Sequence, residues 1–268
     1  MTDELRTYPT GVPCWIQNET SDPSAAAVFY GGLFGWTYSA VDSADPTSYL
    51  FARLDGQDAG AIARADDRGW VSFIACDDID EACARVARLG GRVIDEPDAG
   101  TPFGRSATCA DPQGAIFRLW QAGSHPGSQI VNTPGAWNFS DLHTPDPSAS
   151  LDFYGGVFGW RVDDELGAGM IRLPGYGDHL EATVDPDIRE RQAFAPEGFA
   201  DVIAGITSDR DAAWWIRFTV ADRDESAARA VELGGVVESS TETDWTREAV
   251  VRDPQGARFI VSQLAPPE

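Results

Sequence analysis

A stretch of fifteen residues occurs twice in this chain, and the duplication limits the folds available to it. Residues 22–36 (DPSAAAVFYGGLFGW) return as residues 146–160 (DPSASLDFYGGVFGW), 124 residues later and without a gap. A repeat of this length indicates that the chain is built from duplicated units. A role proposed for a residue in one half can therefore be compared with its counterpart in the other half.

Each copy of the repeat is predicted to form a capped helix. Asp22 or Asp146 is expected to accept hydrogen bonds from the first free N–H groups, and a proline occupies the first helical position. Gly31-Gly32 and Gly35 are expected to end the first helix. We interpret the repeat as structural, with Trp36 and Trp160 as packing residues. Helical spacing predicts one buried face, formed by Val28 or Leu151, Phe29, Leu33 or Val157, and Phe34.

Length and charge narrow the class of protein. A chain of 268 residues can form two domains, each with its own core. The net charge of −23 disfavours nucleic acid and anionic membranes as partners, because both would be repelled. Residues 1–4 lack a basic, apolar signal region, so we expect a cytoplasmic protein. Four cysteines without CxxC spacing are predicted to be small buried residues, not disulfides or zinc ligands: Cys14, Cys76, Cys83 and Cys109.

The order of predicted elements is that of an α+β protein with four βαβββ modules. In the first half, strands are expected at 12–20, 49–54, 59–64, 70–76, 105–110 and 115–120, with a second helix at 78–89. In the second half, residues 214–220 and 222–233 repeat 70–76 and 78–89 at an offset of 144. We predict an N-terminal domain (1–124), a linker (125–134) rich in Gly, Ser and Pro, and a C-terminal domain (135–268).

The change of offset from 124 to 144 places about twenty extra residues between the third and fourth modules. We expect them within residues 185–211. This segment is either an ordinary surface loop or a lid over a cavity.

The repeated motifs carry a family resemblance. The stretches FYGGLFGW and FYGGVFGW, the LGG after each second helix, and DPQGAIFRLW resemble the vicinal oxygen chelate superfamily. That superfamily includes glyoxalase I, extradiol dioxygenases and bleomycin-resistance proteins. The sequence is most similar to its tandem, two-domain actinobacterial branch, whose members carry the labels glyoxalase-like protein or hydroxylase. The resemblance implies two tandem glyoxalase-like domains whose curved mixed sheets surround cavities, and the fold hosts enzymes and simple binders alike.

The resemblance also implies positions for a metal. Metalloenzymes of the superfamily bind a divalent ion with His and Glu side chains from four strands. Three of the four ligand positions in each half hold side chains that are not ordinary ligands: Trp15 and Phe139, Val71 and Trp215, and Arg118 and Ile260. The fourth position falls near Ile62 in the first half and near Glu181 in the second. We therefore expect no metal and no other cofactor.

Strand alternation predicts which side chains face the first cavity. Glu19 and Arg118 are expected to form a salt bridge there. The full set is mostly apolar, with three polar groups, and is expected to bind a flat hydrophobic ligand: Trp15, Gln17, Glu19, Phe73, Arg118 and Trp120.

The second cavity is richer in reactive groups. Asp141 and His143 lie two residues apart on one predicted strand, which places them about 7 Å apart on the same side. A carboxylate beside an imidazole suits general acid–base catalysis. Alternatively, His143 lies at the solvent rim and Asp141 pairs with Arg217 as part of the structure. The predicted catalytic residues are Asp141, His143 and Glu181, and the predicted ligand-binding residues are Phe139, Trp215, Arg217 and Arg258.

Three functions remain open from the sequence. The first is a metal-independent lyase, isomerase or hydrolase that acts on a hydrophobic, aromatic or polyketide-like molecule of secondary metabolism. The second is a binding protein that sequesters or carries such a molecule. The third, which the replaced ligands disfavour, is a metal-dependent glyoxalase or dioxygenase. A monomer and a homodimer are both compatible with four modules in one chain.

Overall fold

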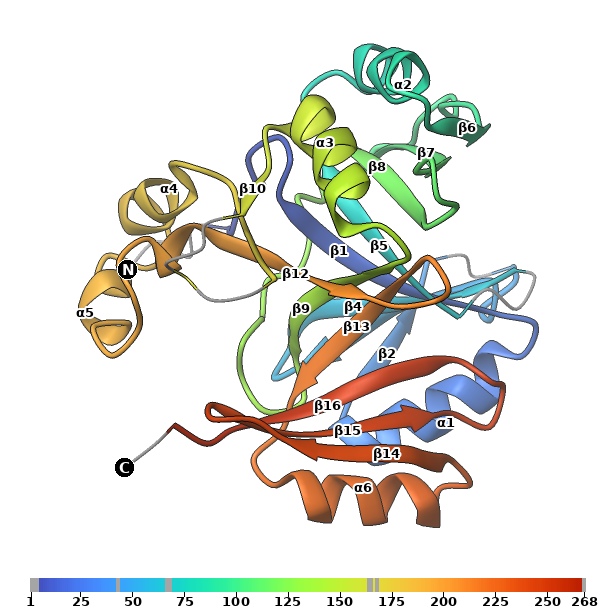
Figure 1. Cartoon of the computed structure of the whole chain (residues 1–268). Coiled ribbons are helices and arrows are strands. Elements are labelled where there is room, and N and C mark those ends of the chain that lie inside the picture. The colour runs from blue at the N-terminus through green and yellow to red at the C-terminus, as the bar shows by residue number, and fades with distance from the viewer. Residues whose placement is uncertain (1–4, 42–43, 66–68, 163–165, 167–168, 267–268) are drawn as a thin grey trace. The chain divides into compact units, whose positions relative to one another are not determined.

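The computed structural model describes the chain except residues 1–4, 42–43, 66–68, 163–165, 167–168 and 267–268 (Figure 1). The expectation about a signal segment concerned residues 1–4, which lie outside the described residues. None of the described helices combines the length and the apolar character needed to cross a membrane.

The four predicted βαβββ modules are confirmed. The first contains β1 (Pro13–Thr20), α1 (Pro23–Phe34), β2 (Thr37–Ala40), β3 (Tyr49–Leu54) and β4 (Gln57–Arg64). The second contains β5 (Gly69–Ala75), α2 (Ile79–Arg88), β6 (Arg92–Asp95), β7 (Gly104–Ala110) and β8 (Ile116–Ala122). The third contains β9 (Trp137–Thr144), α3 (Pro147–Phe158), β10 (Arg161–Val162), β11 (Met170–Arg172), α4 (Tyr176–Ala182), α5 (Ile188–Arg191), the 3-10 helix η2 (Phe199–Asp201) and β12 (Val202–Ser208). The fourth contains β13 (Ala213–Thr219), α6 (Arg223–Glu232), β14 (Val236–Glu242), β15 (Thr246–Arg252) and β16 (Arg258–Leu264).

The strands form two mixed sheets of the same design. Their strand orders are β2-β3-β4-β1-β5-β8-β7-β6 and β10-β11-β12-β9-β13-β16-β15-β14. The first and fourth strands of a module pair in parallel, as β1 does with β4 and β9 with β12. The other pairs within a module are antiparallel, as in β2–β3 and β15–β16. The α+β class predicted from the module order is therefore confirmed.

Packing divides the chain into two compact units that do not follow the sequence halves. One unit comprises Met1–Cys14, Ser72–Gly127 and Ser140–Trp214, and therefore joins most of the second and third modules. The other comprises Trp15–Val71, Ser128–Phe139 and Trp215–Glu268, and joins the first and fourth modules. Each unit has its own buried cluster of apolar side chains.

Helices α1 and α3 begin as predicted, and α1 ends at Gly35 as predicted, whereas Gly31-Gly32 lie inside it. Asp22 Oδ1 accepts from the N–H of Ala25 at 3.0 Å, and Pro23 takes the first helical position. The helix then runs through Gly31-Gly32 to Phe34, and only Gly35, with φ of 74°, ends it. The predicted buried face is wrong at one position, because Val28 is 72% exposed.

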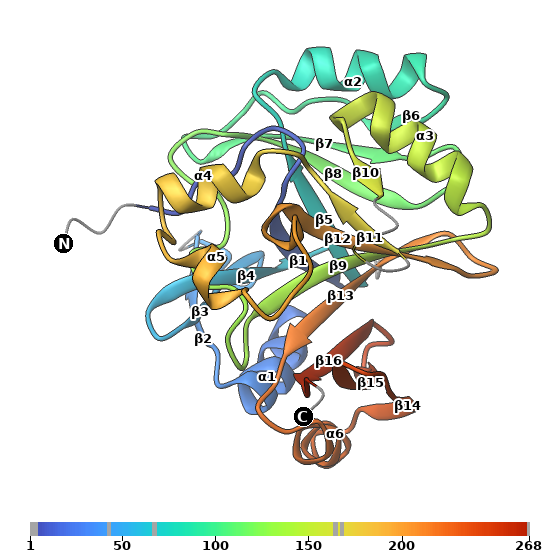
Figure 2. The ribbon, with the colours of Figure 1, turned by 60° about the vertical axis from the view of Figure 1, so that its left-hand side comes forward.

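The second glycine of each repeat makes room for a leucine of the partner module. A Cβ on Gly32 would lie 2.8 Å from Leu233 Cδ2, just beyond α6. In the other unit, a Cβ on Gly156 would lie 2.8 Å from Leu89 Cδ1, just beyond α2. In each unit, a YGG motif and an LGG motif thus form the two sides of a contact between helices. In one of the units these helices are α2 and α3, which lie side by side in Figures 1 and 2.

The tyrosine of each repeat joins the same pairs of modules through a buried hydrogen bond to an aspartate, and it also accepts from a buried tryptophan. Tyr30 Oη donates to Asp253 Oδ2 at 2.8 Å and accepts from Trp70 Nε1 at 2.9 Å. Burial raises the pKa of the Asp253 carboxyl, while Tyr30 and backbone N–H groups favour its ionised form. In the other unit, Tyr154 makes the matching bonds to Asp111 and Trp214, at 3.3 and 3.1 Å.

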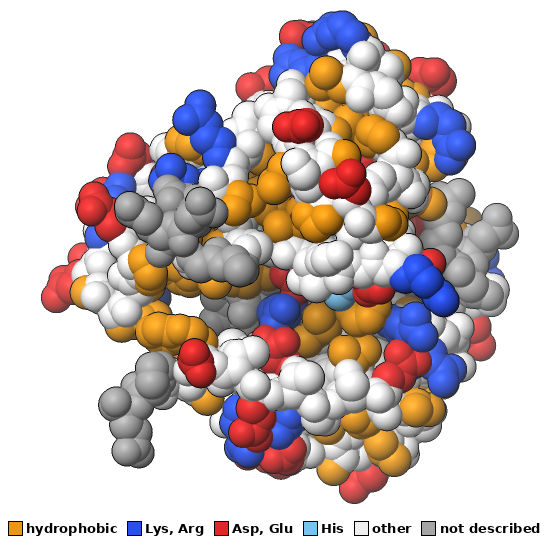
Figure 3. Space-filling view, viewed as in Figure 1, with side chains coloured by type: hydrophobic (Ala, Val, Ile, Leu, Met, Phe, Trp, Pro, Cys, Tyr) orange, Lys and Arg blue, Asp and Glu red, His pale blue; other side chains and the backbone are white. Residues whose placement is uncertain are grey.

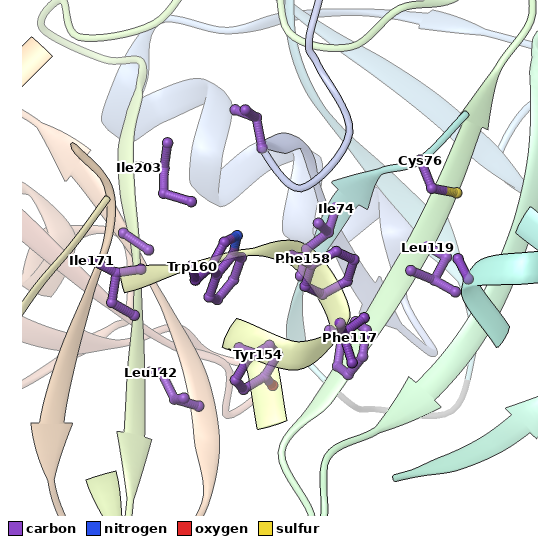
Figure 4. Close-up of a cluster of buried hydrophobic side chains, with 14 of the residues drawn as sticks. Ile74, Cys76, Phe117, Leu119, Leu142, Tyr154, Phe158, Trp160, Ile171 and Ile203 are labelled. Carbon is purple, nitrogen blue, oxygen red and sulfur yellow. The ribbon is translucent and has the colours of Figure 1, made fainter. Parts of the chain in front are cut away.

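The inserted residues of the third module are part of a core. They lie between β11 and β12 and include α4, α5 and η2. Tyr176, Leu180 and Ile188 belong to the same buried cluster as Tyr154 and Trp160, part of which Figure 4 shows around α3. His179 Nε2 also lies 3.1 Å from the carbonyl oxygen of Thr7, so α4 is held against the N-terminal segment (Figure 2). The insertion is therefore a packed helical segment of this unit.

The remaining composition-based expectations concern the surface and the thiols. Cys14, Cys76, Cys83 and Cys109 are free and buried, as predicted. On the face in Figure 3, arginine and acidic side chains are interspersed. Pairs such as Arg53–Asp58 (2.9 Å) and Arg105–Asp80 (2.9 Å) offset the charge of individual carboxylates.

Candidate functional site

The two faces of each sheet can be told apart by membership of the buried clusters. Leu142 of β9 belongs to one cluster, so Asp141 and His143 lie on the opposite face of that strand. Phe259 and Val261 of β16 belong to the other cluster, which places Arg258 opposite them. The same alternation places all of the strand residues predicted for the site on the face away from the core.

In the first half, an aromatic group lies over small residues of β4. Register aligns Gln17, Ala61 and Phe51 across β1, β4 and β3. Trp15 Nε1 donates to Tyr49 Oη at 3.4 Å, and the Trp15 and Phe51 ring centroids are 5.8 Å apart. The small side chain of Ala61 therefore lies between Gln17 and Phe51 on this face of the sheet.

The charged residues predicted for the first half have other described partners. Glu19 Oε1 accepts from Gln17 Nε2 at 3.1 Å, and Glu19 is 1% exposed. The Arg118 guanidinium lies 5.4 Å from the centroid of the Phe73 ring, a cation–π distance. The Phe73 and Trp120 rings are 6.1 Å apart. The predicted Glu19–Arg118 salt bridge stays a prediction.

In the second half, Asp141 and His143 lie beside Gly205 and Thr207 of β12, and His143 also reaches Asp209 in the turn after β12. Gly205 pairs with Asp141, and Thr207 pairs with His143. His143 Nδ1 lies 2.9 Å from Asp209 Oδ2, and Asp141 is 7% exposed. The hydrogen bond from His143 lowers the pKa of the Asp209 carboxyl below its usual value. A buried carboxylate and a hydrogen-bonded imidazole therefore share one strand face.

The carboxylate of Asp141 fits because its neighbour on β12 has no side chain. A Cβ on Gly205 would overlap Asp141 Oδ1. Glycine inside a strand often marks such a close approach. Gly205 was missed from the sequence, although a glycine within VIAGITS is a signal that could have identified it.

We expect Gly205→Ala to lower the free energy of unfolding by about 1–3 kcal/mol, because the added Cβ forces the Asp141 carboxylate to move. Urea unfolding measures the loss. The same substitution made in an Asp141→Ala background should cost much less, since the overlapping atom is gone. An equal cost in both backgrounds would contradict the assigned contact.

Equivalent positions of the two halves hold different side chains on this strand face. Gln17 and Ala61 of the first half correspond to Asp141 and Gly205 of the second. A second matched pair is found at the strand ends, where Ala65 N–H donates to Thr20 O at 3.1 Å and Asp209 N–H donates to Thr144 O at 3.0 Å. Ala65 and Asp209 are therefore equivalent positions, as are Glu19 and His143.

The arginines predicted to bind an anion are paired with glutamates in their own unit. Arg217 Nη1 forms an ion pair with Glu248, whose Oε1 also accepts from Thr246 Oγ1 at 2.6 Å. Arg258 Nε lies 2.7 Å from Glu238 Oε2, and the Arg258 side chain is more than half exposed. Both glutamates were missed from the sequence, because cross-strand partners depend on register. Phe139 and Trp215 are half-buried on their strands.

The position given to Glu181 was wrong. Glu181 lies on α4 and pairs with Arg189 at 3.1 Å, on the exposed side of the insertion. The inserted residues come before the last strand of the module. That strand is therefore β12, and it does not contain Glu181. The first-half position near Ile62 also changes, because Ile62 packs in the core and Ala61 and Ala63 face the other way.

The residues at the inherited ligand positions do not fit a divalent metal ion. Trp15, Phe139 and Ile260 offer no ligand atom, and Arg118 is cationic. The corrected strand positions hold Ala61 and Ala63 in the first half, and Gly205 and Thr207 in the second. In the part of the chain that the structure describes, His, Cys, Asp and Glu side chains form no group of three that could hold a metal.

Comparison with known proteins agrees with the module pattern. The family model for a glyoxalase-like domain matches residues 15–120 and again residues 139–262. The chain belongs to this family. It is 32% identical to the anthracycline biosynthesis protein DnrV of Streptomyces peucetius over 276 residues, which covers 96% of this chain and 94% of DnrV.

Solved structures show the same fold at low sequence identity. The Mn(II)-bound glyoxalase from Novosphingobium aromaticivorans has a TM-score of 0.63 and 16% identity, covering 96% of this chain and 84% of that one. The 2,3-dioxygenase LapB from Pseudomonas sp. KL28 has a TM-score of 0.60 and 13% identity, covering 96% and 93%. The predicted membership of the vicinal oxygen chelate superfamily is confirmed.

Proposed function

We propose that this protein is an enzyme of secondary metabolism that transforms an aromatic, polyketide-like molecule by acid–base chemistry without a metal. Asp141 and His143 are the proposed proton-transferring residues. The observation that carries the proposal is that the buried carboxylate of Asp141 and the imidazole of His143, which is hydrogen-bonded to Asp209, lie on one face of β9. The similarity to DnrV, over nearly the full length of both chains, supports the substrate class.

Acid–base chemistry is the reaction type that this set of residues favours. A positioned imidazole can accept a proton from a carbon next to a carbonyl, or from a phenol, and return it elsewhere in the molecule. The buried Asp141 carboxylate can stabilise the resulting imidazolium or accept a proton itself. The replaced ligand positions support a mechanism that uses protein side chains alone.

The proposal is tested by turnover in the presence of a chelator. Purified protein, with and without excess EDTA, is incubated with a panel of anthracycline-type polyketides, and products are followed by chromatography and mass spectrometry. We expect a product whose rate of formation is unchanged by EDTA. Loss of activity with EDTA that Mn²⁺ or Fe²⁺ restores would contradict the metal-independent mechanism. Quenching of tryptophan fluorescence without any product would instead favour sequestration or transport of the ligand.

A further inference from the structure

We propose that Asp209 is a positioning residue for His143, holding the imidazole as the tautomer that carries its proton on Nδ1. The neutral ring then has its lone pair on Nε2, which becomes the proton-accepting atom. The catalytic consequence rests on the function proposed above, whereas the tautomer itself can be measured without a substrate.

The carboxylate of Asp209 is fixed on both sides. Its Oδ2 lies 2.9 Å from His143 Nδ1, and its Oδ1 accepts from the N–H of Arg210 at 2.6 Å. Its own N–H donates to Thr144 O at 3.0 Å, which anchors the turn to the end of β9. The acceptor is thus held by the backbone at the strand end where His143 lies.

The chemistry of the pair sets the direction of the hydrogen bond. The Asp209 side chain is 40% exposed and its pKa is lowered, chiefly by the hydrogen bond from His143, so it is ionised at neutral pH. An ionised carboxylate only accepts hydrogen bonds, so the shared proton belongs to Nδ1. The hydrogen bond made by one ring nitrogen decides which of the two nitrogens carries the proton.

The duplication provides an internal comparison. The first half makes the same backbone bond, Ala65 N–H to Thr20 O, with alanine in place of Asp209 and Glu19 in place of His143. This backbone bond therefore forms without an aspartate at the position. Carboxylate and imidazole occur together in the half that also carries the Asp141–Gly205 pair.

Nitrogen NMR of the imidazole rings tests the assignment on the whole protein. The chain has three histidines, and His143→Gln identifies the signal of His143 by its loss. In the native protein we expect neutral His143 to be mainly the Nδ1–H tautomer. In Asp209→Ala this preference should be lost. In Asp209→Asn it should reverse, because the amide oxygen keeps the N–H of Arg210 and the amide NH2 then donates to Nδ1. Asp211→Ala, two residues away and paired with Arg210, is the matched control and should behave as the native protein.

The two proposals can fail separately. A tautomer that is unchanged in Asp209→Ala would overturn the role of Asp209, whatever the activity. If the tautomer changes, we expect the kcat of Asp209→Ala to fall about ten-fold or more, since an orienting carboxylate keeps a catalytic imidazole in the working tautomer. If the tautomer changes in Asp209→Ala but kcat stays native, the role of Asp209 in setting the tautomer stands and the catalytic role of His143 is contradicted.

Discussion

Replacing His143 with glutamine is expected to lower the turnover of an anthracycline-type polyketide by about 10²–10³-fold, because general acid–base catalysis typically contributes an effect of this size. Glutamine keeps a polar side chain that can hydrogen bond to Asp209 but cannot exchange a proton near neutral pH. The loss should therefore appear in kcat, with a smaller change in KM. Steady-state kinetics on the substrate found in the polyketide panel measures both constants.

A second histidine offers a matched control for this experiment. His179 lies on α4 and bonds to Thr7, away from the strands that carry Asp141 and His143. His179→Gln should retain turnover close to that of the native protein. Asp141→Asn should lower turnover as His143→Gln does. Native turnover in both the Asp141 and His143 variants would eliminate these residues as the catalytic pair.

The scaffold could be predicted from the sequence because the chain contains two copies of it. The gapless repeat at 124 residues aligned β1 with β9 and placed Asp141 and His143 on one strand face. Sequence alone could not show that modules pair crosswise into compact units. That result depends on contacts such as Gly32 with Leu233, where two separate motifs meet only in three dimensions.

The candidate site was predicted in part, and the error has a definite cause. The extra residues of the third module were expected within 185–211, whereas the insertion between β11 and β12 spans 173–201, so the prediction was right only in part. This misplaced the last strand of the module, so Glu181 was assigned to a strand and Asp209 was overlooked. An aspartate in the sequence Ser-Asp-Arg-Asp carries no signal of its own, and only the folded turn brings it to His143.

The two halves show how one scaffold can carry different chemistry. Tyr30 and Tyr154, with their aspartate and tryptophan partners, are the same in both units. The face away from the core differs between the halves, with Gln17 and Glu19 in one and Asp141 and His143 in the other. Such an arrangement explains how one half could gain titratable groups while the other gained an aromatic cluster.

The largest loss of stability is expected when the tyrosine of the first repeat is changed. Tyr30→Phe removes the donor to Asp253 Oδ2 and the acceptor for Trp70 Nε1. Because both groups are buried, we expect the free energy of unfolding to fall by about 2–4 kcal/mol. Tyr154→Phe should cost less, since its bond to Asp111 is 3.3 Å long, compared with 2.8 Å for Tyr30 to Asp253. Urea unfolding followed by tryptophan fluorescence measures the difference.

Tyr38 provides the control within the same unit. Its hydroxyl is buried, and within the described part of the chain it has no hydrogen-bond partner. Burial also raises the pKa of this hydroxyl. Tyr38→Phe removes the same atom without breaking a described bond, so stability should stay equal or rise slightly. Equal losses in Tyr30→Phe and Tyr38→Phe would show that the buried Tyr30–Asp253 hydrogen bond does not hold the first and fourth modules together. A loss confined to Tyr30→Phe would show why both copies of the repeat keep a tyrosine beside their paired glycines.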